Sequence, residues 1–147
     1  MDNKTEIGVV EMGANHVGEI KRLCKIAEPD YGIITNIGKA HLEGFGTIEN
    51  IIKTKSELYD YIKEIKGKVF YNFNNEIRRK KVESLYLEAI DFDGITSIVK
   101  GEVLPHKEFL SIELQVGEFK SEIHTNLVGS YNLENVLASI SVGNYFG

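Results

Sequence analysis

The stretch from Ile33 to Tyr59 constrains the fold more than any other part of the sequence. It opens with a short β-branched run that ends at Asn36, crosses a glycine-rich polar loop, and enters a long helical pattern at Thr47. A buried strand, a polar loop and a helix in this order form half of a βαβ unit. The sequence therefore predicts an α/β fold with a mostly parallel sheet flanked by helices.

The segments around this stretch extend the same alternation. Glu6–Glu11 is a short apolar run that predicts a buried parallel strand, and the following amphipathic helix is expected to end at Pro29. A second helix is expected to end before Gly67. The predicted elements are strands at 6–11, 31–35 and 68–71 and helices at 19–28 and 47–65.

The pattern changes in the second half of the chain. From about Ile95 to Leu127 apolar and polar residues alternate, and Gly117 with Glu118 predicts a tight turn, so we expect a small antiparallel sheet. A last helix is expected after a cap at 129–130. We expect one domain over residues 1–147, with a parallel α/β part at 1–94, an antiparallel hairpin part at 95–128 and a closing helix at 129–147.

Charge and cysteine content exclude several classes of protein. The net charge of −5 disfavours nonspecific binding to nucleic acid or to an anionic membrane. The basic run 78–81 is interpreted as the solvated face of a helix. Cys24 is the only cysteine and is expected in the core, and no apolar run approaches the ~20 residues needed to span a bilayer. These features favour a cytoplasmic protein.

Lys55 lies on the apolar stripe of the second helix. Desolvating an ammonium group is unfavourable, so such a lysine extends its amine to the edge, pairs with an acid or is chemically modified. The first alternative is the common one. On this apolar face the amine is expected to be partly desolvated, and desolvation lowers the pKa of a lysine.

Polar side chains follow the predicted strands. Glu11, Asn36 with the nearby His41, and Asn72 would all reach the same end of a parallel sheet, where such sheets bind ligands. A carboxylate and an imidazole near a lysine indicate a site for a cation or a phosphate. The alternative is that strands often end in Asn for local reasons of turn formation.

Asn132 and Asn135 lie three residues apart in the first turn of the last helix. Their carboxamides can pair with the edge of a heterocycle near a helix end that favours anions. From spacing alone, solvated or capping asparagines are the more common interpretation.

Two long segments carry a family resemblance. EMGANHVGEI at 11–20 and ITNIGKAHLEGFG at 34–46 resemble the central ATP-binding domain of the Mur ligases, and TKSEL at 54–58 and GSYNLEN at 129–135 match in the same order. The strongest resemblance is to the members that add D-alanyl-D-alanine to UDP-N-acetylmuramoyl-tripeptide. It spans nearly the whole chain.

The resemblance implies roles for individual residues. Glu11 matches a magnesium ligand, and His41 matches a ligand of a second magnesium ion. Lys55 matches a lysine that is carbamoylated in the intact enzyme and acts, with His41, in catalysis. Residues that match positions near the ATP cofactor are Asn132, Asn135, Asn36 and Asn15.

The implied reaction is ATP-driven amide formation through an acyl phosphate, in peptidoglycan precursor synthesis. The implied partners are small molecules, UDP-N-acetylmuramoyl-tripeptide and D-alanyl-D-alanine, with no nucleic acid or membrane. Two alternatives stay open. One is a related Mur or folylpolyglutamate-type ligase domain, and the other is a noncatalytic binding domain of the same fold.

The phosphate-binding pattern GxxxxGK[ST] does not occur in these 147 residues. We therefore expect a truncated central domain that lacks this loop and the amino- and carboxyl-terminal domains, and no ligase turnover from the chain alone. In such a fragment Lys55 is expected as a plain lysine near an acidic partner. Exposed edges of a truncated sheet would also favour self-association.

Overall fold

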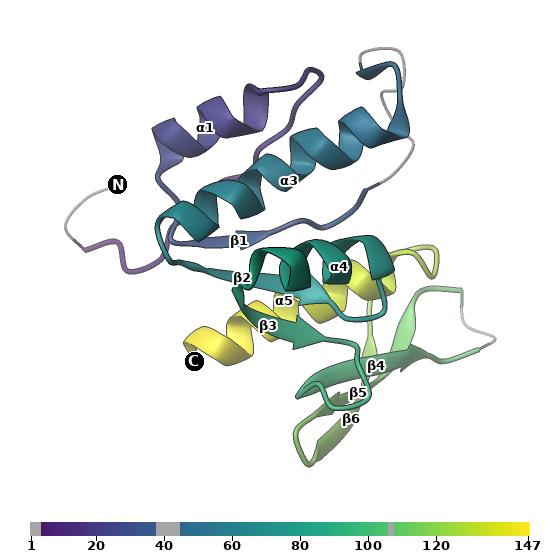
Figure 1. Cartoon of the computed structure of the whole chain (residues 1–147). Helices are drawn as coiled ribbons and strands as arrows, with labels where there is room; N and C mark the ends of the chain where they lie inside the picture. Colours follow the sequence, from purple (N-terminus) through teal and green to yellow (C-terminus); the bar gives the residue numbers. More distant parts are fainter. Residues whose placement is uncertain (1–3, 38–44, 106–107) are drawn as a thin grey trace.

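The computed structural model describes residues 4–37, 45–105 and 108–147, and its elements alternate between strands and helices before a final antiparallel region (Figure 1). In chain order they are α1 (Glu19–Ala27), β1 (Tyr31–Ile33), α3 (Ile48–Glu64), β2 (Lys68–Asn72), α4 (Glu76–Leu85), β3 (Glu88–Phe92), β4 (Val99–Val103), β5 (Ser111–Val116), β6 (Phe119–His124) and α5 (Asn132–Phe146).

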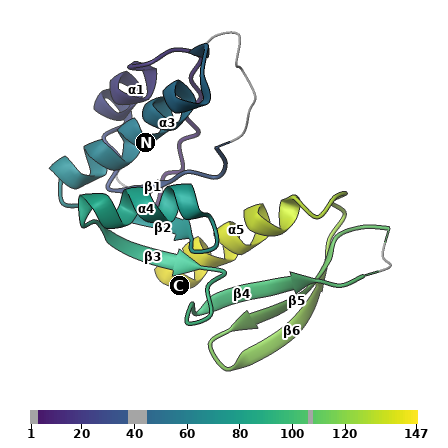
Figure 2. The same ribbon diagram turned by 45° about the vertical axis from the view of Figure 1, so that its right-hand side comes forward.

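Two three-stranded sheets organise the chain. The first has the order β1-β2-β3 with all strands parallel, and the second has the order β4-β5-β6 with antiparallel neighbours. Figure 2 shows them as separate sheets with α5 crossing between them. The predicted fold class, a parallel sheet with helices and a small antiparallel sheet, is confirmed.

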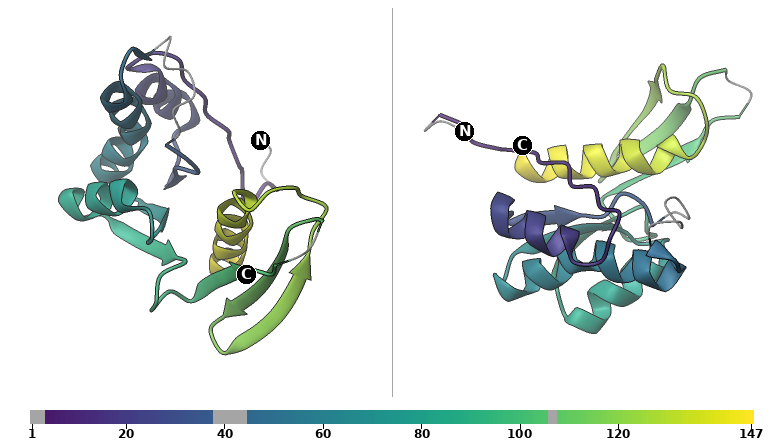
Figure 3. Two further views of the ribbon diagram at one scale, coloured as in Figure 1. Left: turned by 90° about the vertical axis from the view of Figure 1, so that its right-hand side faces the viewer. Right: turned by 90° about the horizontal axis from the view of Figure 1, so that it is seen from above.

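Helices cover both faces of the parallel sheet, and its central strand β2 is therefore buried on both sides. The adjacent residues Val69 and Phe70 of β2 face opposite ways. Val69 joins a cluster with Tyr59 and Ile62 of α3, whereas the Phe70 ring lies 5.5 Å from the ring of Tyr145 in α5. Figure 3 shows α1, α3 and α4 on one side of the sheet and α5 on the other.

A second apolar cluster joins the two sheets through α5. Leu137 and Ala138 of α5 pack with Phe92 of β3 and with Val99 and Leu114 of the antiparallel sheet. Leu137 has no exposed surface. The helix therefore fixes the antiparallel sheet against the parallel one, and the polar first turn of α5 stands at a defined place relative to both.

The prediction of a strand at Glu6–Glu11 is wrong. This segment pairs with no strand, and Ile7, Val9 and Val10 are 54%, 91% and 53% exposed. A strand of a parallel sheet needs a hydrogen-bonded neighbour and burial on both faces, and the segment has neither in the described part of the chain. It runs as an extended chain past α5 towards α1 (Figure 3).

Three other expectations differ from the structure. The third parallel strand β3 was not predicted, because its only strongly apolar residues are Ile90 and Phe92. The expected cap at 129–130 is not formed, since α5 begins at Asn132 without a side-chain cap bond. The basic run was expected on a solvated face, but Arg78 is only 2% exposed. Helical spacing of four residues places Arg78 on the same stripe as buried Val82.

Within the described residues, no helix is long and apolar enough to cross a membrane. Cys24 is a buried free thiol, as the sequence predicts.

The first prediction concerns Gly67, which joins α3 to β2 and lies close to the backbone of Asp30. A Cβ at this position would lie 2.3 Å from the backbone oxygen of Asp30. We expect Gly67→Ala to lower the free energy of unfolding by about 1–3 kcal/mol, because the backbone has to shift. Urea denaturation followed by circular dichroism measures the change.

Gly143 is the matched control for this substitution. It lies within α5, and a Cβ there would meet nothing within 4 Å. Gly143→Ala is expected to raise the free energy of unfolding by about 0.5–1 kcal/mol through helix propensity. Equal effects of both substitutions would contradict the close approach at Gly67.

Candidate active site

The candidate site lies at the outer edge of β1. A cavity of about 800 Å³ opens between the amino-terminal segment (residues 5–15), β1 and the carboxyl-terminal half of α5. Four residues singled out from the sequence line this cavity together: Glu11, Asn15, Asn36 and Lys55. The apolar part of its wall includes Ile7, Val10, Phe70 and Phe146.

Lys55 reaches the site from α3, whose first turn is capped by the Thr47 hydroxyl accepting from the amide of Asn50. The Lys55 Nζ donates to the backbone oxygen of Asn36 at 2.7 Å and to its Oδ1 at 2.9 Å. Both acceptors are neutral. Among the described residues Lys55 has no ion pair, so the expected acidic partner is absent there, and an amide takes its place.

Burial lowers the pKa of Lys55, and repulsion by the Arg78 guanidinium adds to that shift. The lowered pKa agrees with the expectation from the apolar stripe. It increases the fraction of neutral amine at a given pH, and only the neutral amine is a nucleophile.

Two glutamates hold the loop that carries Asn15. The Glu19 carboxylate accepts from the backbone amides of Asn15 at 2.7 Å and His16 at 3.0 Å. Glu57, on α3 two residues after Lys55, accepts from the amides of Gly18 at 2.7 Å and Lys21 at 2.9 Å. The turn at Gly18 has a φ of 94°, which glycine adopts without strain.

Glu57 was missed by sequence reasoning. Glu57 lies on α3 but accepts a hydrogen bond from the amide of Gly18 at the amino-terminal end of α1. The two residues are 39 positions apart, so no local spacing in the sequence indicates this bond. Its carboxylate suits the free amides and the positive dipole end of α1.

Glu11 is exposed in the extended segment and lines the cavity. Magnesium prefers oxygen ligands and is commonly held by one or two carboxylates together with phosphate oxygens and water. One carboxylate beside the amide oxygens of Asn15 and Asn36 fits this donor chemistry. His41, the other expected ligand, lies outside the described residues, and within them no group of three or more metal-binding side chains occurs.

Asn132 and Asn135 form a second group at the start of α5, apart from the cavity lining. The Asn132 Nδ2 donates to the backbone oxygen of Val128 at 2.9 Å, and the Asn135 Nδ2 donates to the Asn132 Oδ1 at 3.3 Å. Asn135 is exposed. Asn72, expected at the same rim as Asn36, is buried and bonded to Asp93 and Asn74 instead.

The sequence matches the Mur ligase middle domain over residues 1–143. Similar proteins include the UDP-N-acetylmuramoyl-tripeptide--D-alanyl-D-alanine ligases of Bacillus subtilis (strain 168), 29% identical over all of this chain and 31% of that protein, and Escherichia coli (strain K12), 28% identical over 94% of this chain and 32% of that protein.

Solved structures agree in fold. MurF from Acinetobacter baumannii is 28% identical with a TM-score of 0.76, over 92% of this chain and 30% of that one. MurF from Thermotoga maritima in complex with ADP is 28% identical with a TM-score of 0.75, over 91% and 31%. The chain thus spans about a third of the length of these relatives. With the family pattern matching nearly the whole sequence, the chain belongs to the Mur ligase family, of which it represents the middle domain.

Proposed function

We propose that residues 1–147 act as the middle domain of an ATP-dependent amide ligase of peptidoglycan precursor synthesis, which adds D-alanyl-D-alanine to UDP-N-acetylmuramoyl-tripeptide. The observation that carries the proposal is the cavity at β1, where Lys55, Asn36 and Glu11 meet within a domain of this family. We also propose that the reaction takes place in the cytoplasm, where ATP is available.

The proposed reaction has two steps. The tripeptide carboxylate attacks the γ-phosphorus of ATP and releases ADP, which gives an acyl phosphate. The amine of D-alanyl-D-alanine then attacks the acyl carbon and releases phosphate. Phosphoryl transfer depends mainly on positioning the reactants and on neutralising the negative charge of the phosphates. The protein must therefore supply cations, held by fixed oxygen ligands, next to the phosphate groups.

Glu11 and His41 are the residues that would hold magnesium in this proposal. Bound there, the metal would supply charge neutralisation at phosphate oxygens. Asn15 and Asn36 would stand beside the ATP phosphates, and Asn132 with Asn135 would contact the nucleotide base by paired donors and acceptors. The exposed carboxamide of Asn135 supports the last role, since an exposed side chain is accessible to a ligand.

Lys55 is proposed to be carbamoylated in the active ligase. Its lowered pKa supports this role, because the neutral amine reacts with carbon dioxide. The neutral acceptors at Asn36 support the plain ammonium form in this chain, since a carbamate at the same place would meet the carbonyl oxygens that Nζ now binds.

A noncatalytic nucleotide-binding domain is the second candidate. It would use the same cavity and the Asn132–Asn135 group to bind nucleotide without turnover. Ligation by a chimeric ligase that contains these 147 residues separates the two candidates, because neither predicts turnover from the 147-residue chain alone.

The first functional prediction concerns nucleotide. In ¹H–¹⁵N spectra of the chain, millimolar MgADP is expected to shift the side-chain signals of Asn132, Asn135 and Asn36, and weak binding is expected because the phosphate loop is missing. ATP hydrolysis dependent on both tripeptide and dipeptide substrates is not expected from this chain alone. Steady ADP release under those conditions would contradict this prediction, and unchanged signals would contradict the nucleotide roles.

A second prediction concerns Lys55 and is measured by NMR titration of ¹³C-lysine-labelled protein. Lys55 is expected to titrate below the ordinary lysine range, because burial and the nearby Arg78 guanidinium lower its pKa. Between the lowered pKa of Lys55 and the ordinary lysine value, the unfolded chain binds more protons than the folded one. The free energy of unfolding should therefore rise with pH in that window, and Lys55→Met should abolish this rise.

The role of Lys55 in catalysis is tested in a chimera, with these 147 residues replacing the matched segment of the B. subtilis relative. Lys55→Ala should lower ligation about 100-fold or more, because charge stabilisation is lost, while Lys53→Ala should keep it. Added short-chain carboxylates should partly restore the Lys55→Ala activity. Full activity of Lys55→Ala would show that Lys55 only packs against the helix.

Self-association is the remaining prediction. Among the described residues no strand pairs with the outer edge of β1, and a free edge favours pairing with a second chain. Light scattering is expected to show dimers at high protein concentration. A strict monomer would contradict this expectation.

A further inference from the structure

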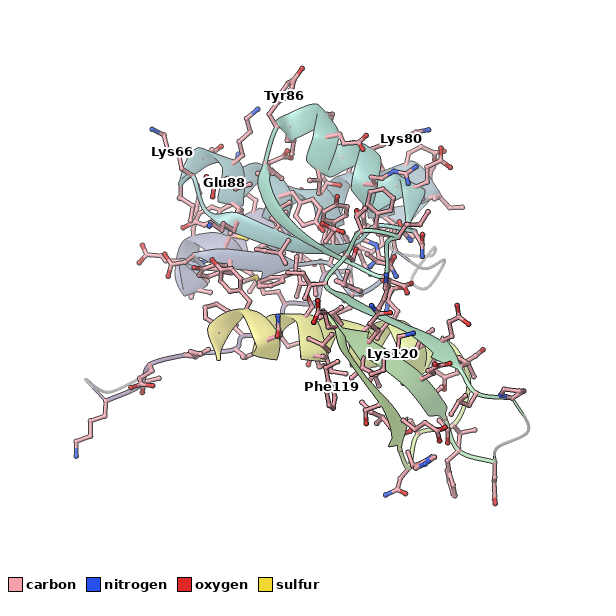
Figure 4. All side chains as sticks on the ribbon, turned by 90° about the horizontal axis from the view of Figure 1, so that it is seen from below. Lys66, Lys80, Tyr86, Glu88, Phe119 and Lys120 are labelled. Atoms are coloured by element: carbon pink, nitrogen blue, oxygen red, sulfur yellow. The ribbon has the colours of Figure 1, made fainter. Side chains whose placement is uncertain are left out.

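Arg78 is a buried cation that the proposed function does not yet use. Its side chain projects from the buried stripe of α4 and is 2% exposed. A guanidinium in such a place is strongly unfavourable unless its charge and its donors are satisfied. Lys80 of the same basic run differs: it extends into solvent (Figure 4), and its ion pair among the described residues is with Glu76 on its own helix.

The contacts of Arg78 reach two distant parts of the chain. Its Nη1 donates to the backbone oxygens of Ile34 at 2.7 Å and Thr35 at 3.0 Å, just after β1. The same Nη1 forms an ion pair with Glu134 of α5. One side chain on α4 therefore contacts Ile34, which is 44 residues before it, and Glu134, which is 56 residues after it.

The segment after β1 is held by two cations. Arg78 takes the carbonyl oxygens of residues 34 and 35, and Lys55 takes the next one, at Asn36, with its side-chain oxygen. Three successive carbonyl groups thus accept hydrogen bonds from these two side chains. The position of Asn36 in the cavity depends on both side chains.

The ion-pair partner of Arg78 lies at the start of α5, next to the two asparagines proposed to contact the nucleotide. Glu134 stands in the first turn of α5, between Asn132 and Asn135. A carboxylate in a first turn is favoured by the helix dipole, and here it also balances the charge of Arg78. The ion pair ties this turn to the chain after β1.

We propose that Arg78 is a positioning residue that holds the Asn36–Lys55 half of the site and the Asn132–Asn135 half in a fixed relation. That these two groups of residues belong to one ligase site rests on the proposed function. Arg78 itself touches neither substrate nor nucleotide. It acts through the backbone after β1 and through Glu134.

A role in core packing alone does not account for this arrangement. Buried ion pairs are often replaced by apolar side chains of similar volume without loss of stability, so they are weak evidence for a stabilising role. The Arg78 Nε has no hydrogen-bond partner among the described residues, so the buried guanidinium is incompletely satisfied, which is unfavourable for stability.

Hydrogen exchange of the 147-residue chain tests the connection. In Arg78→Met, exchange of the segments 34–37 and 129–135 is expected to rise about tenfold or more, because both lose a held contact, while β5 and β6 keep their rates. Glu134→Gln should accelerate exchange at the start of α5. The control Lys80→Met should leave every segment unchanged. A rise in only one of the two segments, or in neither, in Arg78→Met would overturn the proposal.

Two further readouts separate positioning from packing. Arg78→Lys, which restores the charge and donors, should return the exchange of both segments towards the wild-type rates. The titration midpoint of Lys55 should move to higher pH in Arg78→Met and stay in place in Lys80→Met. An unmoved Lys55 midpoint in Arg78→Met, or no restoration by Arg78→Lys, would overturn the proposal.

The outcome for Arg78 is separable from the proposed function. If MgADP leaves the wild-type spectra unchanged, the nucleotide roles of Asn132 and Asn135 fail. The exchange and titration results still decide whether Arg78 connects the two segments, because neither measurement needs a ligand. If MgADP binds, its effect on the Asn36 signals should disappear in Arg78→Met while the effect at Asn135 persists, and an unchanged effect at Asn36 would overturn the proposal.

Discussion

The burial of α5 between the two sheets is the constraint on which the rest of the structure depends. The side chain of Leu137 is fully buried in the cluster of Phe92, Val99 and Leu114, so one face of α5 packs against both sheets. Complete burial of a leucine side chain is worth about 1.5–3 kcal/mol. Since the same helix carries Asn132 and Asn135 on its first turn, the packing of its apolar face also determines where those polar groups stand.

Electrostatic contacts then connect this helix to the cavity at β1. Burial of Arg78 is tolerated because its Nη1 donates to two backbone oxygens and pairs with Glu134. Lys55, the second cation of this region, has only neutral acceptors among the described residues, and burial together with repulsion by Arg78 lowers its pKa. The difference between the two side chains is chemically useful, because arginine keeps its charge under all ordinary conditions and lysine can lose it.

The sequence predicted most elements because their signals are local. Pro29 ends α1, Thr47 caps α3, and the alternation around Gly117 gives the antiparallel hairpin. The prediction failed at Glu6–Glu11, where an apolar run has no neighbouring strand in the described chain. β3 was missed for the opposite reason: its residues are only weakly apolar, and pairing with β2 alone makes it a strand.

For the candidate site, the sequence by itself determined which chemical groups are present: the segments around Glu11 and Asn36, the lysine on an apolar stripe, and the paired asparagines near the end of the chain. It also determined the family, because these segments are long and occur in order. The tertiary structure decided which of them meet. Glu11, Asn15, Asn36 and Lys55 line one cavity, whereas Asn132 and Asn135 stand apart and are joined to it by Arg78. Contacts of this kind follow from the packing of whole helices and sheets over distances of many residues, and no spacing within a single helix or strand encodes them.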